Sequence, residues 1–208
     1  VIPGIMEHVE RAGVHSGDSM AVYPTMNLSE REIHTLVDYT TRICKGLGIR
    51  GLMNIQFVIM GGYSSPTQRE PSQSELSEVY VLEVNPRASR TIPFVSKCIG
   101  RSLAKVGALC MAGLSLKDQN FLKEIIPPYY SVKEAVFPFT KFMGVDPILG
   151  PEMKSTGEVM GFDDDFGMAI AKSQIAASNS LPKSGSAFLS VKDTHKQEIV
   201  GIAQRLTK

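Results

Sequence analysis

Apolar residues recur along the chain at two spacings, one typical of helices and one typical of strands. Ser29 and Glu32 have the spacing of a capping box, and the apolar positions after them predict a helix that ends near Gly46 or Gly48. A second helix is predicted over 102–111. The inward positions of the first helix are Ile33, Leu36, Val37, Cys44 and Leu47, and those of the second are Leu103, Val106, Leu109 and Cys110.

Short apolar runs predict the strands. Residues 52–60 and 79–82 form one candidate pair, and 5–10 and 131–137 are further strands. The stretch 61–77, rich in Gly, Ser, Pro, Gln and Glu, predicts an extended hairpin loop that is a neutral surface insertion.

The end of the chain predicts a strand over 187–191, followed by a helix with apolar residues at Ile199, Ile202, Ala203 and Leu206. A strand and one helix cannot bury their own apolar faces. We therefore expect this to be the first βα unit of another domain, and the chain to be a piece of a longer polypeptide. Residues 179–185 are the predicted linker.

Composition excludes several classes of function. The net charge of +1 without a Lys/Arg run argues against a nucleic-acid surface, and no apolar stretch reaches bilayer length, which argues against a membrane protein. The cysteines, Cys44, Cys98 and Cys110, are scattered among apolar residues. This pattern predicts reduced core thiols in the cytoplasm, with neither a zinc site, a disulfide nor a catalytic thiol.

The strongest chemical signal lies at the end of the 79–82 strand. Glu83 and Asn85 are two residues apart and would share a strand face, where a carboxylate and an amide oxygen suit Mg²⁺. Arg87 and Arg90 follow and can bind a phosphoryl group. A buried Glu–Arg pair at a strand end is the alternative, but Gln56 on the neighbouring strand favours the metal site.

Two further segments offer weaker signals. The stretch from Gly13 to Ser19 places glycines around small polar residues, so its backbone could approach a ribose or phosphate, although an ordinary Asx or Ser turn explains it equally well. The acidic run 163–165 predicts a helix N-terminus rather than a metal cluster.

Together these segments resemble the large subunit of carbamoyl phosphate synthetase. The resemblance covers nearly the whole chain and is carried by residues 12–19 (Ala-Gly-Val-His-Ser-Gly-Asp-Ser), 51–57 (Gly-Leu-Met-Asn-Ile-Gln-Phe), 83–97 (beginning Glu-Val-Asn-Pro-Arg), 127–134 (Pro-Pro-Tyr-Tyr-Ser-Val-Lys-Glu) and 144–161 (ending Ser-Thr-Gly-Glu-Val-Met-Gly). That family has two homologous ATP-grasp halves, and this chain is similar to the second, carbamate-phosphorylating half. The 61–77 insertion is longer than the family pattern.

The resemblance implies an α/β (α+β) fold. Residues 1–115 would form the C-terminal lobe of an ATP-grasp fold, with an antiparallel sheet and flanking helices and incomplete at its N-terminus. Residues 116–183 would complete the carbamoyl phosphate synthesis domain and the linker. Residues 184–208 would open an allosteric domain of methylglyoxal-synthase-like fold.

The resemblance also implies roles for individual residues. Mg²⁺ or Mn²⁺ would be held by Gln56, Glu83 and Asn85, and ATP by these side chains together with Gly13, Val14, His15 and Ser16. Arg87 and Arg90, with Asn85, would orient carbamate and neutralise the transferred phosphoryl group. A K⁺ site would be formed by His8, Glu10 and Ser19, although a satisfied core histidine explains His8 equally well.

The implied activity is glutamine-dependent, ATP-driven synthesis of carbamoyl phosphate for arginine and pyrimidine biosynthesis. The implied partners are carbamate, ATP and a glutaminase small subunit or domain, in the cytoplasm or a plastid stroma. Alone, the chain is expected to bind ATP poorly and to turn over negligibly. The rivals are another ATP-grasp ligase, such as a biotin carboxylase-like or purine-pathway enzyme, and a non-catalytic regulatory module. The 127–134 and 144–161 segments argue against the first, and intact polar residues at a strand end argue against the second.

Overall fold

The computed structural model describes residues 1–61, 77–141, 144–179 and 182–207. In chain order its strands and helices are β1 (Glu7–His8), β2 (Ala21–Tyr23), α1 (Glu30–Gly46), β3 (Asn54–Met60), β4 (Glu78–Asn85), α2 (Thr91–Cys98), α3 (Leu103–Met111), β5 (Tyr130–Val136), β6 (Gly157–Asp163), α4 (Phe166–Ala176) and α5 (Lys196–Leu206), with 3-10 turns at Phe139–Lys141 and Asp193–His195. All strand pairings are antiparallel. The predicted mixed α/β class with an antiparallel sheet and flanking helices is therefore confirmed.

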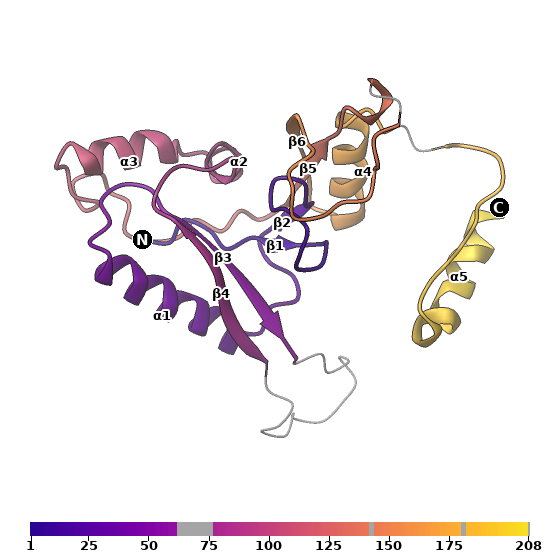
Figure 1. The fold of residues 1–208 in the computed structure, drawn as a ribbon, viewed down its shortest axis with the longest axis horizontal. Coiled ribbons are helices and arrows are strands. Elements are labelled where there is room, and N and C mark those ends of the chain that lie inside the picture. The colour runs from indigo at the N-terminus through magenta and orange to yellow at the C-terminus, as the bar shows by residue number, and fades with distance from the viewer. Residues whose placement is uncertain (62–76, 142–143, 180–181, 208) are drawn as a thin grey trace.

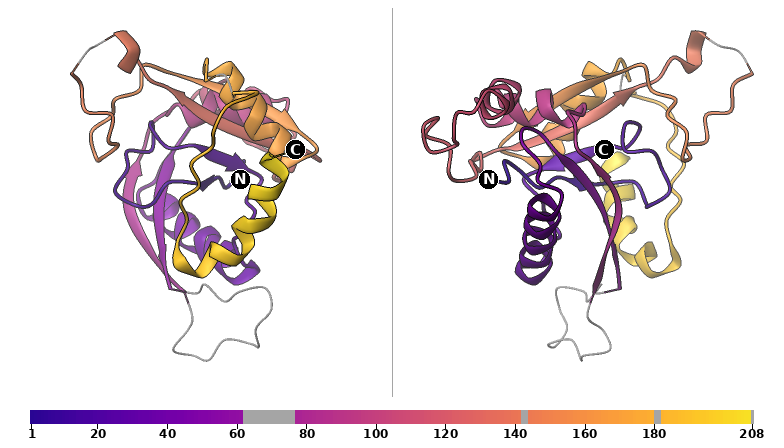
Figure 2. Two further views of the ribbon diagram at one scale, coloured as in Figure 1. Left: turned by 90° about the vertical axis from the view of Figure 1, so that its right-hand side faces the viewer. Right: turned by 60° about the vertical axis from the view of Figure 1, so that its left-hand side comes forward.

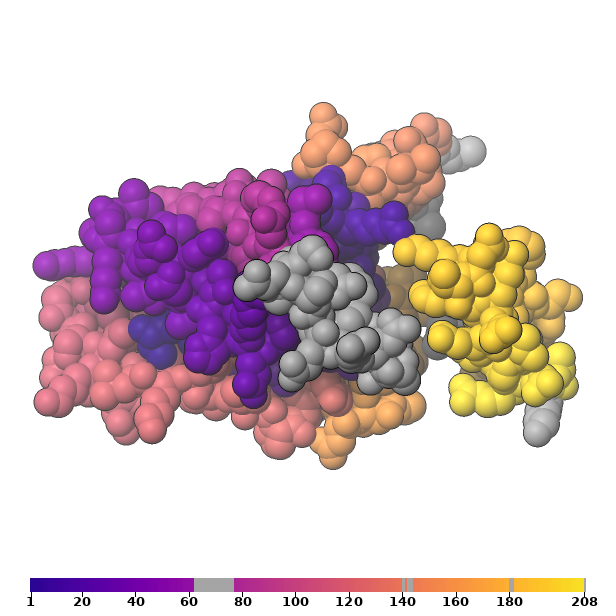
Figure 3. Space-filling view, turned by 90° about the horizontal axis from the view of Figure 1, so that it is seen from below, coloured from indigo at the N-terminus to yellow at the C-terminus, as the bar shows by residue number. Residues whose placement is uncertain are grey.

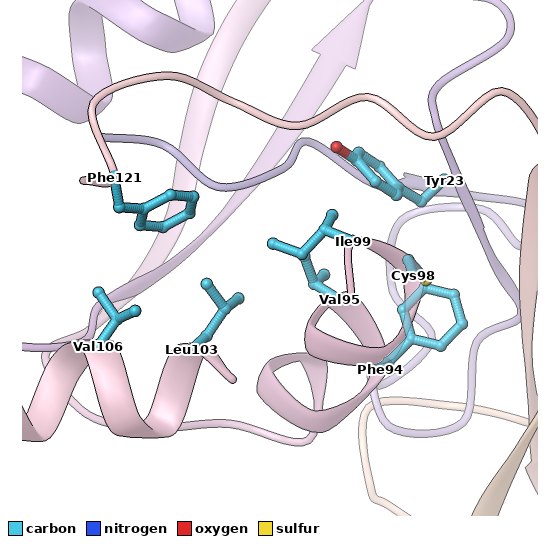
Figure 4. Close-up of a cluster of buried hydrophobic side chains, with 8 residues drawn as sticks. All are labelled: Tyr23, Phe94, Val95, Cys98, Ile99, Leu103, Val106 and Phe121. Carbon is cyan, nitrogen blue, oxygen red and sulfur yellow. The ribbon is translucent and has the colours of Figure 1, made fainter. Parts of the chain in front are cut away.

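A four-stranded sheet in the order β1-β2-β5-β6 has helices on both faces (Figure 1). Adjacent residues of β2 point to opposite sides because strand side chains alternate. Val22 packs with Val132 and Ala169 against α4. Tyr23 packs on the other face with the α2–α3 layer, in a cluster shown in Figure 4 that also contains Phe94, Val95, Cys98, Ile99, Leu103, Val106 and Phe121. The sheet therefore lies at the centre of the buried core.

Helix α4 approaches β6 unusually closely at Gly161. A Cβ atom there would lie 2.2 Å from the backbone oxygen of Ala169 and 2.4 Å from the nitrogen of Ser173, so only glycine fits. The helix begins as predicted from the acidic run, since the Asp165 side chain accepts a hydrogen bond from the Met168 nitrogen at 2.8 Å.

The second sheet is a two-stranded ribbon of β3 and β4, alongside which α1 lies (Figure 1). The capping box of Ser29 and Glu32 is present at the start of α1, and Ser102 caps α3, so both predicted helices are confirmed. The central residues of the connection between β3 and β4, 62–76, lie outside the described residues, and the prediction of a hairpin loop there remains a prediction.

The strand predicted over 187–191 is wrong for this chain. These residues have no regular secondary structure, and Phe188 is 93% exposed. A lone segment cannot complete a ladder without a neighbouring strand, and none of the described strands pairs with it. The predicted helix does form as α5, which stands apart from the sheet in Figure 1 and is the separate yellow mass in Figure 3; in the two views of Figure 2 it overlaps the rest of the chain.

The predicted strand over 5–10 is shorter than expected, since only Glu7–His8 pair as β1. The strands expected at 52–60, 79–82 and 131–137 form as β3, β4 and β5 with shifted ends. Among the described residues, no helix combines the length and the apolar character needed to cross a membrane.

Candidate active site

The register of the ribbon brings the predicted metal ligands together. Gln56 lies directly opposite Glu83, and Asn54 lies opposite Asn85. Side chains at directly opposed positions share a face, with Cβ atoms about 5 Å apart. The Asn85 amide nitrogen also donates to Glu83 Oε1 at 3.0 Å. Gln56, Glu83 and Asn85 therefore form one polar group at the end of the ribbon, and Asn54 extends it.

This polar group faces a groove of about 2240 Å³. The groove is also lined by Arg87 and Arg90, which follow β4, and by Val14, His15 and Ser16 from the N-terminal loop. Among the predicted nucleotide residues, Gly13 does not line it. Residues predicted from three separate stretches of sequence thus line one groove that is large enough for a nucleotide.

The donor set fits a magnesium ion that is shared with a ligand. Glu83 supplies one carboxylate, and the amides of Gln56 and Asn85 supply neutral oxygens. Mg²⁺ commonly takes only one or two carboxylates from the protein and fills the remaining positions with phosphates and water. Over the described ranges, no group of three or more His, Cys, Asp or Glu side chains is arranged for a metal. A magnesium ion held by Glu83 and the two amides would therefore have coordination positions left for phosphate and water.

The two arginines differ in how firmly they are held. Arg87 is exposed, and its Nη1 donates to the neighbouring Ala88 carbonyl at 3.0 Å. Arg90 is half-buried, and its Nη1 donates to the hydroxyl of Ser155 at 3.0 Å. A guanidinium has only donors, so both groups can bind an anion in the groove with the nitrogens that remain.

The loop from Gly13 to Ser19 is tightly folded. The His15 nitrogen donates to the Gly150 carbonyl at 2.8 Å, and His15 Nδ1 accepts from the Gly17 nitrogen at 3.0 Å. A Cβ on Gly17 would lie 2.9 Å from the sulfur of Met153, so glycine allows the loop to pack under that side chain. Because Nδ1 is engaged, Nε2 of His15 is the nitrogen available to a ligand.

The sequence analysis did not assign a role to Asp18 or Ser155, which hold this loop. Asp18 is 1% exposed and accepts from the nitrogens of Lys154 at 2.8 Å and Ser155 at 2.9 Å. Burial acts to raise the pKa of Asp18, but these hydrogen bonds outweigh it and hold the pKa below its usual value. The only local signal was the Gly-Asp-Ser motif of the loop, and that motif does not indicate that Asp18 pairs with a residue as distant in sequence as Ser155.

The three residues predicted for a monovalent cation lie where β1 meets β2. The Val9 nitrogen donates to the Met20 carbonyl at 3.0 Å, which continues the pairing and brings Glu10 beside Ser19. His8 and Glu10 line the groove, whereas Ser19 is buried and its hydroxyl donates to the His15 carbonyl at 3.3 Å.

Burial shapes the protonation of this cluster. Burial, together with the nearby charge of Lys133, lowers the pKa of His8 to about 4, so its imidazole is neutral near pH 7. Burial raises the pKa of Glu10, whose buried Oε2 has no hydrogen-bond partner among the described residues. A neutral imidazole and a carboxylate oxygen that has no partner among the described residues are compatible with a cation, and the charge of Lys133, which acts on both His8 and Glu10, would compete with it.

Comparison with known sequences identifies the family. Residues 2–119, more than half of the chain, match the family described as "Carbamoyl-phosphate synthase L chain, ATP binding domain". The chain belongs to this family. The family predicted from the resemblance is thereby confirmed.

The relatives in this family are much longer proteins. The carbamoyl phosphate synthase large chain of Pseudomonas putida is 53% identical over 206 residues, covering 99% of this chain and 18% of that protein. The large chain of Vibrio vulnificus is 51% identical over 208 residues, which cover 100% of this chain and 18% of that protein. The chain therefore spans about a fifth of the length of the curated relatives it matches.

Among solved structures, a biotin carboxylase domain of a single-chain bacterial carboxylase is 16% identical. The superposition covers 57% of this chain and 25% of the chain of that carboxylase, with a TM-score of 0.44. That likeness is too partial to identify a fold.

Proposed function

We propose that this chain is part of a carbamoyl phosphate synthetase large chain and carries residues that use ATP to phosphorylate carbamate. The observation that carries the proposal is the pairing of Gln56 with Glu83, beside Asn85, on one face of a groove. Family membership supports the same assignment, because the matching family is described as an ATP-binding domain. The proposed fold of the parent region is an ATP-grasp lobe.

In this proposal Gln56, Glu83 and Asn85 hold Mg²⁺ or Mn²⁺ together with the nucleotide phosphates. The bound metal supplies charge neutralisation for the phosphates. Gly13, Val14, His15 and Ser16 contact the nucleotide, with Gly13 acting through the conformation of the loop. Arg87 and Arg90 orient carbamate, and Asn85 assists them.

The reaction is a phosphoryl transfer. A carbamate oxygen attacks the γ-phosphorus, a new P–O bond forms, and the bond from that phosphorus to the β,γ-bridging oxygen breaks, so carbamoyl phosphate and ADP result. Such reactions depend mainly on positioning and on charge neutralisation. Arg90 is suited to this role because it is half-buried and already anchored on one side.

We also propose that His8, Glu10 and Ser19 form a K⁺ site beside the nucleotide loop. The buried Glu10 oxygen, for which the described part of the chain offers no hydrogen-bond partner, and the neutral His8 imidazole support this assignment. Ser19 joins the two sites, because it is the last residue of the 13–19 loop and its hydroxyl donates to the His15 carbonyl within that loop.

The remaining assignments concern the larger protein. We propose a glutaminase subunit or domain as the ammonia source, arginine and pyrimidine synthesis as the pathways, and the cytoplasm or plastid stroma as the compartment. Residues 1–115 and 116–183 would belong to the synthesis domain, and 184–208 would begin a methylglyoxal-synthase-like domain. The apolar face of α5 supports the last assignment, because Ile202 and Leu206 are 44% and 59% exposed.

A chimera tests the proposed function. Residues 1–208 replace the matched 206-residue segment of the Pseudomonas putida large chain, and ATP formation from ADP and carbamoyl phosphate is measured. We expect a rate within about tenfold of the unaltered relative, and a loss of about a hundredfold for Arg87→Ala. Arg42→Ala is the matched control, because Arg42 lies on α1 and pairs only with Asp38 at 3.4 Å among the described residues.

A chimera that folds and assembles but forms no ATP would contradict the proposed function. Normal activity of the Arg87→Ala chimera would contradict the role of Arg87.

A further inference from the structure

We propose that Ser155 is a positioning residue for the phosphoryl transfer, because its hydroxyl joins the Arg90 guanidinium to the backbone of the 13–19 loop. The inference rests on the function proposed above and adds to it a residue that does not touch the substrate. The bridge fixes the spacing between the arginine that binds the transferred group and the loop that binds the nucleotide.

The contacts of Ser155 define the bridge. Its side chain is 4% exposed, and its Oγ accepts from Arg90 Nη1 at 3.0 Å and donates to the Gly17 carbonyl at 3.1 Å. Its backbone nitrogen donates to Asp18 Oδ1 at 2.9 Å. Ser155 lies two residues before the start of β6, and the nitrogen of the intervening Thr156 donates to the Val136 carbonyl of β5 at 2.9 Å, so this segment is joined to the buried sheet.

The loop is held from more than one side. Asp18 receives the two backbone N–H groups of Lys154 and Ser155, and Lys133 Nζ donates to the Ser16 carbonyl at 3.0 Å from β5. Three consecutive loop residues, Ser16, Gly17 and Asp18, are therefore tied to the sheet or to the segment that leads into it. Arg90 is connected to this framework through the Ser155 hydroxyl.

The chemistry of the bridge requires a hydroxyl. Arginine offers only donors and a backbone carbonyl only accepts, so the group between them must accept from one and donate to the other. A serine does both with a single oxygen, whereas alanine does neither. Without the bridge, Arg90 would regain rotamer freedom, and a displacement of about 1 Å can cost about a hundredfold in rate.

The kinetic test uses the same chimera. We expect Ser155→Ala to lower kcat for ATP formation by about tenfold to a hundredfold, with a change in KM for ADP of less than about threefold. Thr156→Val is the matched control, because the neighbouring Thr156 is exposed and, within the described residues, its hydroxyl bonds only to the Val136 carbonyl. This control is expected to keep the original kcat.

A double-mutant cycle separates positioning from simple destabilisation. In an Arg90→Ala background, Ser155→Ala should lower kcat by less than about twofold, because the group it positions is gone. The same loss in both backgrounds, or an unchanged kcat for Ser155→Ala alone, would overturn the proposal.

A second readout needs no nucleotide. In the 208-residue chain, Ser155→Ala should speed amide hydrogen exchange of Gly17, Asp18 and Ser19, and Thr156→Val should not. Unchanged exchange in this segment would overturn the proposal by itself. This measurement does not depend on activity. An inactive chimera would therefore contradict the proposed function, while hydrogen exchange would still test the role of Ser155.

Discussion

The β3–β4 ribbon and the four-stranded sheet differ in how deeply their side chains are buried and in which of the predicted ligands they carry. The ribbon carries the predicted metal ligands, and several of its side chains are exposed, including Tyr80, Val81 and Leu82 at 49%, 41% and 56%. In the sheet, residues 131–135 of β5 are all buried. A two-stranded ribbon contributes little stability by itself. We therefore expect the loss of a proposed metal ligand on the ribbon to affect activity, and the loss of a packing contact in the sheet to affect stability, so substitutions should separate the two regions.

The largest effect is expected on the ribbon. Glu83→Gln keeps the size of the side chain but removes the only carboxylate among the three predicted Mg²⁺ ligands, so ATP formation by the chimera should fall about a thousandfold, or ~4 kcal/mol. The free energy of unfolding of the chain should change by less than about 0.5 kcal/mol, because Glu83 is exposed. Rates and urea unfolding are measured on the same variants.

Glu78→Gln provides the control for that experiment. Glu78 lies on the same strand at the far end of the ribbon, opposite Met60, and its carboxylate accepts from the Tyr80 hydroxyl at 2.6 Å. It does not line the groove. Equal losses of activity at Glu78 and Glu83 would argue against a specific ligand role.

The next effect is expected in the sheet, with the opposite pattern. Gly161→Ala forces a methyl group into the backbone of α4, so the free energy of unfolding should fall by about 3 kcal/mol. Gly201→Ala is the control, because a Cβ on that glycine of α5 meets nothing within 4 Å and alanine favours a helix. A stable Gly161→Ala variant would show that β6 and α4 can separate at little cost.

The smallest effect distinguishes the two regions by thiol chemistry. Cys98 is 2% exposed in the core, and burial raises the pKa of its thiol, so little thiolate forms at pH 8. Cys44, on α1 beside the ribbon, is half-buried. Iodoacetamide should modify Cys44 at least about tenfold faster than Cys98, as followed by peptide mass spectrometry. Equal rates would mean that the core opens as readily as the ribbon side.

Local patterns predicted most of the elements and the ligand face. Gln56 and Glu83 each lie on a recognisable strand, and short-range alternation places Asn85 on the same face as Glu83. The capping box of Ser29 and Glu32 predicted the start of α1 because its two residues lie within one helical turn, and the spacing of apolar residues predicted α3.

Contacts between distant segments could not be predicted. Asp18 and Ser155 meet across 137 positions, and nothing in either stretch indicates its partner. The strand expected over 187–191 failed for a related reason. Its apolar sequence suits a strand, but pairing depends on a neighbour, and none of the described strands supplies one.

The ribbon contains one register shift, between Gln56 and Phe57. The pairs from Phe57–Val81 to Met60–Glu78 separate that irregularity from the connection between the strands. A bulge helps to fix the register of the two strands, because a slip of the strand pairing would also have to move the extra residue. Evolution can therefore lengthen or shorten the connection without disturbing the end of the ribbon that carries Glu83 and Asn85, so the length of the connection should vary among homologues far more than the spacing from Glu83 to Arg90.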